Sequence, residues 1–202
     1  MVEPDDVSGQ HDLEFRLGFE SLLADISARF VSLPAHRVDE AIRDAQRRVC
    51  DLLGVDLCVL WQWVDADRRF MALTHYYGEM PAPPPEPVRA DEFLPWCQHE
   101  ILAGRVVKVT SLDEMPPEAA RDAETSRQFG VKSTLAFPLS VGDELPIGAL
   151  AFNTLKAESE WPEETTNRLR LVAQIFANAL ARKWAEHNLR ESQERLNLAA
   201  GA

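Results

Sequence analysis

The sequence contains no apolar run long enough to cross a membrane as a helix. A membrane-spanning helix needs about 20 consecutive apolar residues, and the best candidate run is interrupted by Asp51, Gly54 and Asp56. The first residues, Met-Val-Glu-Pro-Asp-Asp, are acidic where a secretion signal would be basic. We therefore expect a cytoplasmic protein that does not insert into membranes.

Basic residues and cysteines are also scarce. Lysine and arginine number 21 against 33 aspartates and glutamates, a formal net charge of −12. This balance disfavours binding to nucleic acid or anionic lipid, because both depend on basic side chains that contact phosphate groups. The three cysteines, Cys50, Cys58 and Cys97, are odd in number and lie within apolar patterns. We expect reduced and mostly buried thiols rather than a disulfide framework.

The chain lacks the short motifs that mark many enzymes. It has no Gly-x-Ser-x-Gly, no His-Glu-x-x-His, no phosphate-binding glycine loop and no Cys-x-x-Cys. Cys97 and His99 are a tempting pair, but two residues along a helix correspond to a rotation of about 200°. One helix therefore cannot direct both side chains at one atom. The sequence predicts no catalytic residue and no metal ligand, and it identifies no cofactor.

The most clearly specified element is a β-hairpin over residues 131–155. Its first arm alternates apolar and more polar residues, which is typical of a strand with one face in a core. The second arm is apolar on both faces, with Ala149 and Ala151 on one and Leu150 and Phe152 on the other. Such a strand belongs in the middle of a sheet that is covered on both sides.

Periodicity and turn residues predict the other elements. Apolar spacings of three and four indicate helices, and alternation indicates strands. In chain order we expect a disordered lead-in over residues 1–11, helices over 15–33 and 38–53, strands over 57–64 and 68–77, a proline-rich loop over 78–87, a helix over 91–104 capped by Asp91, a strand over 105–110, a helix over 118–129, the hairpin, and a long helix from Pro162 to about Ala199. This order predicts an α+β fold in which a five-stranded antiparallel sheet carries helices on both faces.

The proline-rich loop over residues 78–87 has two interpretations. Its five prolines exclude a β-ladder or a helix and favour an extended conformation. The loop is either a plain surface connection, which we favour, or a docking site for a partner that binds proline-rich segments.

Three stretches resemble the GAF domain, a small-molecule-sensing module of signalling proteins. They are the amphipathic start at residues 19–30, the hairpin core at 133–139 and 146–150, and the exit helix at 169–180. The resemblance implies a domain over residues 12–185. It also implies a five- or six-stranded sheet in the order 2-1-5-4-3, with the terminal helices on one face and a ligand pocket among short helices and loops on the other.

The exit helix is similar to those of GAF domains that precede PAS domains in bacterial sensor histidine kinases. Residues 189–196 resemble the segment that opens such a PAS domain. The resemblance therefore implies a non-catalytic regulatory module of a two-component histidine kinase. Residues 186–202 would be a helical linker toward a following PAS or output module.

By the same resemblance, a pocket for a small-molecule ligand lies between the sheet and residues 93–101. The candidate lining residues are Trp61, Trp63, Phe93, Trp96, Cys97, Thr134 and Phe152. Aromatic walls with a few polar groups suit a small planar ligand. Aromatic residues at strand and helix spacing belong to a core more often than to a pocket.

The sequence does not match the signatures of two known kinds of ligand binding in the family. Domains that carry a bilin pigment attach it through a cysteine followed directly by histidine, and here Gln98 separates Cys97 from His99. The Asn-Lys-Phe-Asp-Glu signature of cyclic-nucleotide-binding relatives is incomplete after Asn153 and Lys156. The resemblance thus leaves the ligand unidentified.

The last helix extends beyond the end of the domain, so its apolar positions there need a partner helix to cover them. Steps of four and three residues give a seam for a parallel homodimer formed by the terminal helices, although half of its positions are polar: Leu171, Ile175, Asn178, Arg182, Ala185, Leu189, Ser192 and Leu196.

Two alternative functions stay open. One is a small redox enzyme similar to the methionine sulfoxide reductases of this fold, which would need a reactive Cys97. The other is a structural dimerisation spacer, whose interior would be filled by its own side chains.

Overall fold

A six-stranded antiparallel sheet forms the middle layer of the protein, in a computed structural model that describes residues 4–80, 83–84 and 87–200. The strands are β1 (Leu57–Trp63), β2 (Phe70–Gly78), β3 (Val88–Arg89), β4 (Val107–Val109), β5 (Ser133–Leu139) and β6 (Gly148–Thr154). Their order is β3-β2-β1-β6-β5-β4. Apart from the short edge strand β3, this is the predicted order 2-1-5-4-3, and all pairings are antiparallel.

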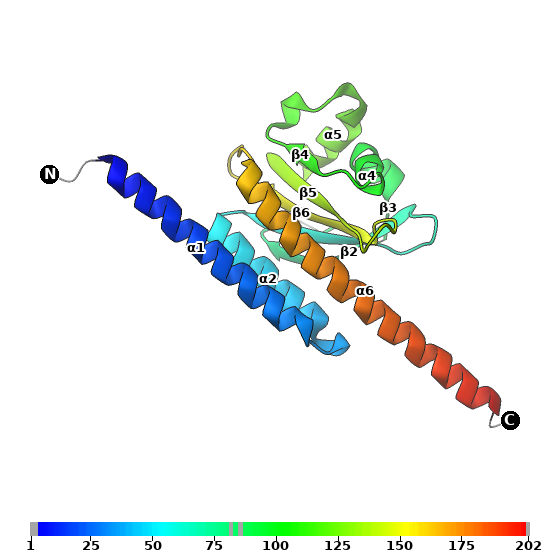
Figure 1. Ribbon diagram of the computed structural model, residues 1–202. Coiled ribbons are helices and arrows are strands. Elements are labelled where there is room, and N and C mark those ends of the chain that lie inside the picture. Colours follow the sequence, from blue (N-terminus) through cyan, green and yellow to red (C-terminus); the bar gives the residue numbers. More distant parts are fainter. Residues whose placement is uncertain (1–3, 81–82, 85–86, 201–202) are drawn as a thin grey trace.

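Long helices cover one face of the sheet and short helices cover the other (Figure 1). The long-helix layer consists of α1 (Pro4–Val31), α2 (Val38–Leu53) and α6 (Glu163–Ala200). The short-helix layer consists of α3 (Ala90–Phe93), α4 (Pro95–Leu102) and α5 (Ala120–Gln128). Each layer has its own apolar core against the sheet, which confirms the predicted α+β architecture. Helices α1 and α6 project beyond the sheet in opposite directions (Figure 1).

The start of the chain differs from the prediction. Helix α1 begins at Pro4, so the disordered lead-in expected over residues 1–11 is wrong from residue 4 onward, and residues 1–3 lie outside the described residues. Proline is favoured at the first helical position, where its missing N–H costs no hydrogen bond. A polar, acidic start is therefore compatible with a helix.

The helix expected over residues 91–104 is also different, because it is split at Leu94 into α3 and α4. The ring of Pro95 disfavours a helical conformation at the preceding residue. Asp91 does not cap this segment: it lies in the first turn of α3 and pairs with Arg89 at 2.8 Å. The cap of α4 comes from elsewhere in the chain.

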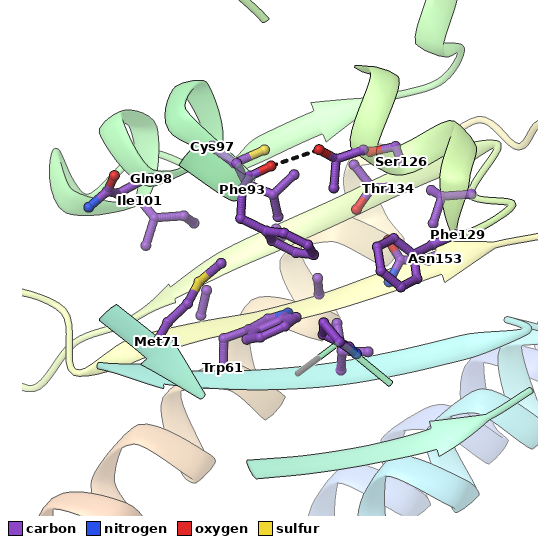
Figure 2. Close-up of a pocket in the computed structure, with 18 of the residues that line it drawn as sticks. Trp61, Met71, Phe93, Cys97, Gln98, Ile101, Ser126, Phe129, Thr134 and Asn153 are labelled. Atoms are coloured by element: carbon purple, nitrogen blue, oxygen red, sulfur yellow. Dashed lines mark hydrogen bonds between the residues drawn. The ribbon is translucent and has the colours of Figure 1, made fainter. Parts of the chain in front are cut away.

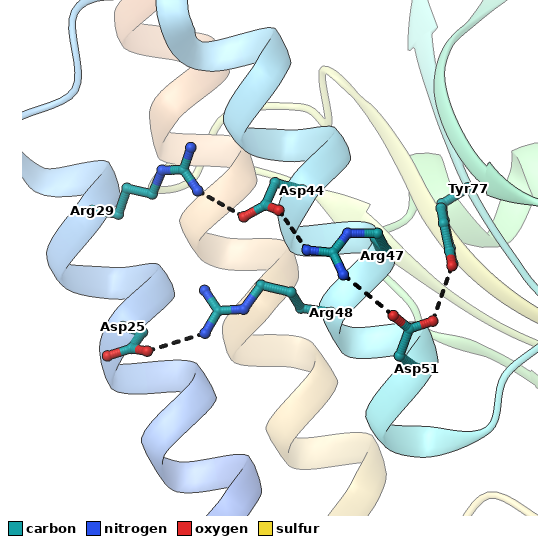
Figure 3. A network of polar contacts seen from close by, with 7 residues as sticks. All are labelled: Asp25, Arg29, Asp44, Arg47, Arg48, Asp51 and Tyr77. Carbon is teal, nitrogen blue, oxygen red and sulfur yellow. Dashed lines mark hydrogen bonds and ion pairs between the residues drawn. The ribbon is translucent and has the colours of Figure 1, made fainter.

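Polar contacts align α1 with α2 and α2 with β2 (Figure 3). Arg29 pairs with Asp44 at 2.7 Å, and Arg48 pairs with Asp25 at 3.0 Å. Exposed ion pairs contribute only about 0–1 kcal/mol each. The buried apolar face of α1 therefore supplies most of its attachment, and the ion pairs fix its alignment.

Gly148 lies against β1 so closely that a side chain does not fit. It pairs with Gln62 of β1 on one side and with Leu139 of β5 on the other. A Cβ at this position would collide with the carbonyl oxygen of Trp61. Because Gly148 is flanked by paired strands on both sides, the backbone cannot easily move away.

We predict that Gly148→Ala lowers the free energy of unfolding by about 2–3 kcal/mol, because paired backbone must shift to make room for the added Cβ. Urea unfolding followed by circular dichroism measures the change. Gly18→Ala is the matched control, since an added Cβ in α1 would meet only Leu52 Cδ1 at 3.8 Å. The control should be neutral or stabilising by up to about 1 kcal/mol. Equal stability of the two variants would contradict the prediction.

Candidate functional site

A cavity of about 120 Å³ lies between the sheet and the short-helix layer. Strands β1, β5 and β6 form its floor, and side chains of the short helices cover it (Figure 2). An apolar cavity of about 150 Å³ in another protein holds one benzene molecule. The space is therefore of the size of one small ring.

Space remains above the sheet because the central strands carry alanine, a small residue, on this face. Ala149 and Ala151 of β6 and Ala136 of β5 line the cavity, and Ala136 is the direct partner of Ala151. Leu150 lies between them in sequence and is buried in the core of the long-helix layer. Because hydrogen bonds to their neighbours hold these strands in place, the sheet cannot collapse into the space left by the small side chains.

Aromatic side chains form a continuous wall. The ring centroid of Phe93 lies 5.7 Å from that of Trp61 and 5.7 Å from that of Phe129. Figure 2 shows Phe93 reaching from the helix layer toward Trp61 on the sheet. Trp63 also lines the cavity, and its buried indole Nε1 has no hydrogen-bond partner among the described residues. Such an unpaired buried donor costs about 1–3 kcal/mol.

Asp122 of α5 fixes the position of α4 over the cavity. Its buried carboxylate accepts hydrogen bonds from the backbone N–H groups of Trp96 at 3.1 Å and Cys97 at 2.8 Å, in the first turn of α4. The residue before α4, Leu94, has no side-chain oxygen that could cap the helix. Thr125 Oγ1 donates to the carbonyl oxygen of Phe93 at 2.8 Å (Figure 2). Helix α5 therefore holds both ends of the α3–α4 break in place.

The thiol of Cys97 is poorly suited to nucleophilic chemistry. Burial, together with the neighbouring carboxylate of Asp122, raises the pKa of Cys97 well above its ordinary value. A protonated thiol is a weak nucleophile. His99 is exposed while Cys97 lines the cavity, so the two residues face different surroundings, as their spacing on a helix predicts.

The cavity gathers five of the seven candidate lining residues: Trp61, Trp63, Phe93, Cys97 and Thr134. Trp96 lies outside it, in a partly buried position against the same apolar core. The placement of Phe152 is wrong, because it pairs with Leu135 and lies in the long-helix layer, with its ring centroid 6.3 Å from that of Phe137. The face of the sheet that Thr134 occupies carries Asn153 instead.

Several lining residues were not predicted, among them Phe129, Ala149, Ala151, Asn153 and Pro84. The alternation of the second hairpin arm already separates the alanine face from Phe152, and this signal could have identified the floor. Pro84 is buried against the cavity, so the proline-rich loop is more than a plain surface connection at this point. Residues 81–82 and 85–86 of that loop lie outside the described residues.

A β-bulge lets strand β2 face both layers. Trp61 of β1 is opposite Leu73, but Leu60 is opposite His75, so Thr74 is an extra residue in β2. Leu73 lies in the core of the short-helix layer, whereas His75 contacts Asp39 of α2. Bulges commonly re-aim a side chain in this way.

The re-aimed His75 joins a polar contact among β2, α2 and α6. Lys183 Nζ of α6 lies 2.6 Å from both carboxylate oxygens of Asp39, and His75 Nε2 lies 3.2 Å from Oδ1. Burial disfavours the charged form of Asp39, but Lys183 and then His75 outweigh it and lower the pKa of Asp39. Burial lowers the pKa of His75, with Arg43 and Lys183 acting in the same direction and Asp39 opposing. At neutral pH the contact is an Asp39–Lys183 ion pair with a neutral imidazole.

Among the residues that the structure describes, no helix is both long and apolar enough to span a membrane, and no group of three or more His, Cys, Asp or Glu could hold a metal ion.

The family model of the GAF domain matches residues 37–181. An uncharacterised protein of Mycobacterium tuberculosis (strain H37Rv) is 29% identical over an alignment of 180 residues, which covers 85% of this chain and 27% of that protein. The chain therefore spans about a quarter of the length of the curated relatives it matches.

Solved GAF domains have the same fold. The phycocyanobilin-bound GAF domain of a cyanobacterial phytochrome has a TM-score of 0.68 at 20% identity, covering 84% of this chain and 97% of that one. The GAF domain of a phosphoenolpyruvate-protein phosphotransferase from Coxiella burnetii has a TM-score of 0.65 at 16% identity, covering 85% and 98%. At these identities the likeness concerns the fold alone.

We predict that Cys97 reacts with iodoacetamide at pH 7 at least about tenfold more slowly than free cysteine, because its raised pKa keeps the thiol protonated. Peptide mapping by mass spectrometry measures the rate at Cys97 separately from those at Cys50 and Cys58. Asp122→Asn removes the negative charge next to the thiol and should speed the reaction. Labelling of the unmodified chain at the rate of free cysteine would contradict this description of the site.

We predict that Lys183→Met lowers the free energy of unfolding by about 1 kcal/mol at pH 7, since the ion pair is partly exposed. The folded-state pKa of Asp39 is depressed below 3.8, so this stabilisation is present above the unfolded pKa and is lost as the pH falls through the folded pKa. Urea unfolding at several pH values should show the two proteins converging in acid. Arg190→Met, at an exposed position farther along α6, should have little effect at any pH, and a pH-independent loss in Lys183→Met would argue against the ion pair.

Proposed function

Because the chain belongs to the GAF domain family, we propose that it is a sensory and regulatory module of a two-component histidine kinase that works in the cytoplasm. GAF domains are generally non-catalytic sensory domains. In this proposal the cavity binds a small ligand, and the terminal helices of a parallel homodimer pass the change to an output module. The kinase context rests on the similarity of residues 189–196 to the start of a PAS domain.

The observation that carries the proposal is that the cavity and the exit helix lie on opposite faces of one sheet and share strand β2. Met71 of β2 lines the cavity, and a few residues farther along the same strand His75 meets Asp39, which binds Lys183 of α6. A shift of β2 on ligand binding would act on this contact. The bulge at Thr74 thus supplies a physical connection between ligand and helix.

Helix α6 becomes exposed after this contact and then projects from the domain (Figure 1). Arg182 donates to the carbonyl oxygens of Phe30, Val31 and Leu33 at 3.0–3.1 Å, where α1 ends, and cations are favoured at helix C-termini. From residue 184 to residue 198 every position of α6 is exposed. Residues 182–183 are therefore the place where a change inside the domain reaches the projecting helix.

The projecting part of α6 supports a dimer with a second copy of the chain. Leu189 and Leu196 are 61% and 66% exposed and lie seven residues apart, the repeat of a coiled coil. Arg182, which is part of the seam expected from the sequence, is already bound to α1. We therefore place the seam beyond it, from Ala185 onward.

The structure offers less support for the alternatives. A reductase similar to the methionine sulfoxide reductases needs a reactive cysteine, and the raised pKa of Cys97 opposes that role. A structural spacer needs an interior filled by its own side chains, whereas a cavity of about 120 Å³ is present. Both observations favour a ligand-binding relay.

We predict that the chain is dimeric and that Leu189→Glu combined with Leu196→Glu weakens the dimer at least tenfold, because charges of one sign would face each other across the seam. Sedimentation equilibrium measures the dissociation constant. Leu198→Glu is the matched control, since Leu198 is exposed on the same helix but lies off the seam, and it should leave the dimer unchanged. A monomer at high concentration in the unmodified chain would sink the dimeric relay.

A further inference from the structure

The size of the cavity, its uncharged lining and its polar end together indicate a class of ligand, which we infer here. The geometry points to a flat, uncharged molecule of about one ring that carries a hydrogen-bond donor and acceptor side by side, as in a lactam or a carboxamide. Asn153 and Thr134 would bind this polar edge. The inference rests on the proposed function only in taking the cavity as a ligand site.

The size and shape of the space set the first limit. Its volume of about 120 Å³ is slightly smaller than the cavity of about 150 Å³ that holds benzene elsewhere. The alanines and Trp61 lie on the sheet side, and Phe93 and Phe129 lie on the helix side, so aromatic rings bound the space from both sides (Figure 2). Aromatic rings bind a second ring by stacking or by edge contact, so a flat ligand fits best.

The absence of charge sets the second limit. Among the described residues that line the cavity, none is Asp, Glu, Lys, Arg or His. The carboxylate of Asp122 lies behind the first turn of α4 and is occupied by two backbone N–H groups. A charged ligand would therefore lose its hydration without gaining a counter-ion, which is strongly unfavourable.

Asn153 and Thr134 mark the polar end. They are direct partners on β6 and β5 and are 6% and 9% exposed, and Figure 2 shows both beside Phe129 at one end of the cavity. Both residues line the cavity. They are not among the described residues that have a fully buried polar side-chain atom without a partner, which are Gln46, Trp63 and Thr154. Two other polar side chains of the lining bind the backbone: Gln98 donates to Arg68 O, and Thr125 Oγ1 donates to Phe93 O. Ser126 lines the cavity as well.

A ligand in the cavity covers the Asn153 and Thr134 side chains, and because buried polar groups normally have partners, it should supply hydrogen bonds to both. A carboxamide offers a donor and an acceptor close together. Its best complement is a neutral group with the same pair in the opposite order, which is the edge of a lactam.

Binding of three small probes to the full chain tests this class. The probes are 2-pyridone, which is a flat neutral lactam, toluene, which has a similar shape without the polar edge, and benzoate, which is charged. Isothermal titration calorimetry should show 2-pyridone binding at least tenfold more tightly than toluene, and no binding of benzoate. Tighter binding of benzoate or of a cyclic nucleotide than of 2-pyridone would overturn the inference.

Two variants connect the result to the residues. Asn153→Leu keeps a similar volume without hydrogen bonds and should weaken 2-pyridone at least tenfold while toluene still binds. Ala151→Leu fills the floor and should abolish binding of both, and circular dichroism with urea unfolding confirms that each variant is folded. If 2-pyridone binds Asn153→Leu as tightly as it binds the unmodified chain, the assigned polar end is wrong.

The same samples separate this inference from the proposed function. If none of the probes binds, but the chain is dimeric and native mass spectrometry finds a retained molecule of another class, the ligand class fails and the relay stands. If 2-pyridone binds as expected and sedimentation finds only monomer, the ligand class stands and the dimeric relay fails.

Discussion

The sheet must satisfy a different layer on each face, and this constraint decides the role of nearly every residue in its central strands. On β6 the large Leu150 and Phe152 face the long helices, while Ala149 and Ala151 face the short ones. The division of sizes is asymmetric, so one face is filled and the other retains space. The fixed distance between hydrogen-bonded strands then preserves that space, because β6 lies between β1 and β5.

The same constraint supports the proposed coupling between the cavity and the exit helix. Helix α6 packs against the filled face of the sheet. A side chain displaced there has no free volume to move into, so its displacement is passed on to its neighbours. In the proposed relay, a ligand in the cavity would act on the strands against which α6 packs. The contact among His75, Asp39 and Lys183 lies near the end of that support, and every position of the helix from residue 184 to residue 198 is exposed.

Much of the architecture could be predicted from the sequence because its signals are local. The alternation of the hairpin arms, the helical spacing around Val38–Leu53 and the glycine that ends this helix all appear in the structure, with Gly54 at φ 64°. The strand order came from resemblance to a family. The length of α1 and the break at Leu94 were missed, since the first depends on whether a polar segment continues a helix and the second on the conformation before a proline.

The site was predicted less completely, because its decisive features join distant segments. The cap of α4 comes from Asp122, 25 residues after Cys97, and no local pattern connects the two. The error at Phe152 has a different origin: Thr134 and Phe152 are both in the hairpin, but which residues share a face depends on the register of pairing, where Leu135 rather than Thr134 is opposite Phe152.

The bulge at Thr74 has a consequence for the chemistry of the cavity. Met71, Leu73 and His75 are evenly spaced in the sequence, and in a regular strand all three would point the same way. The extra residue turns only His75 aside. Without it an imidazole would stand beside Met71 and Leu73 and bring a titratable group into an uncharged space. One inserted residue thus keeps the titratable His75 on the long-helix side of the sheet and leaves the cavity on the short-helix side without a titratable imidazole.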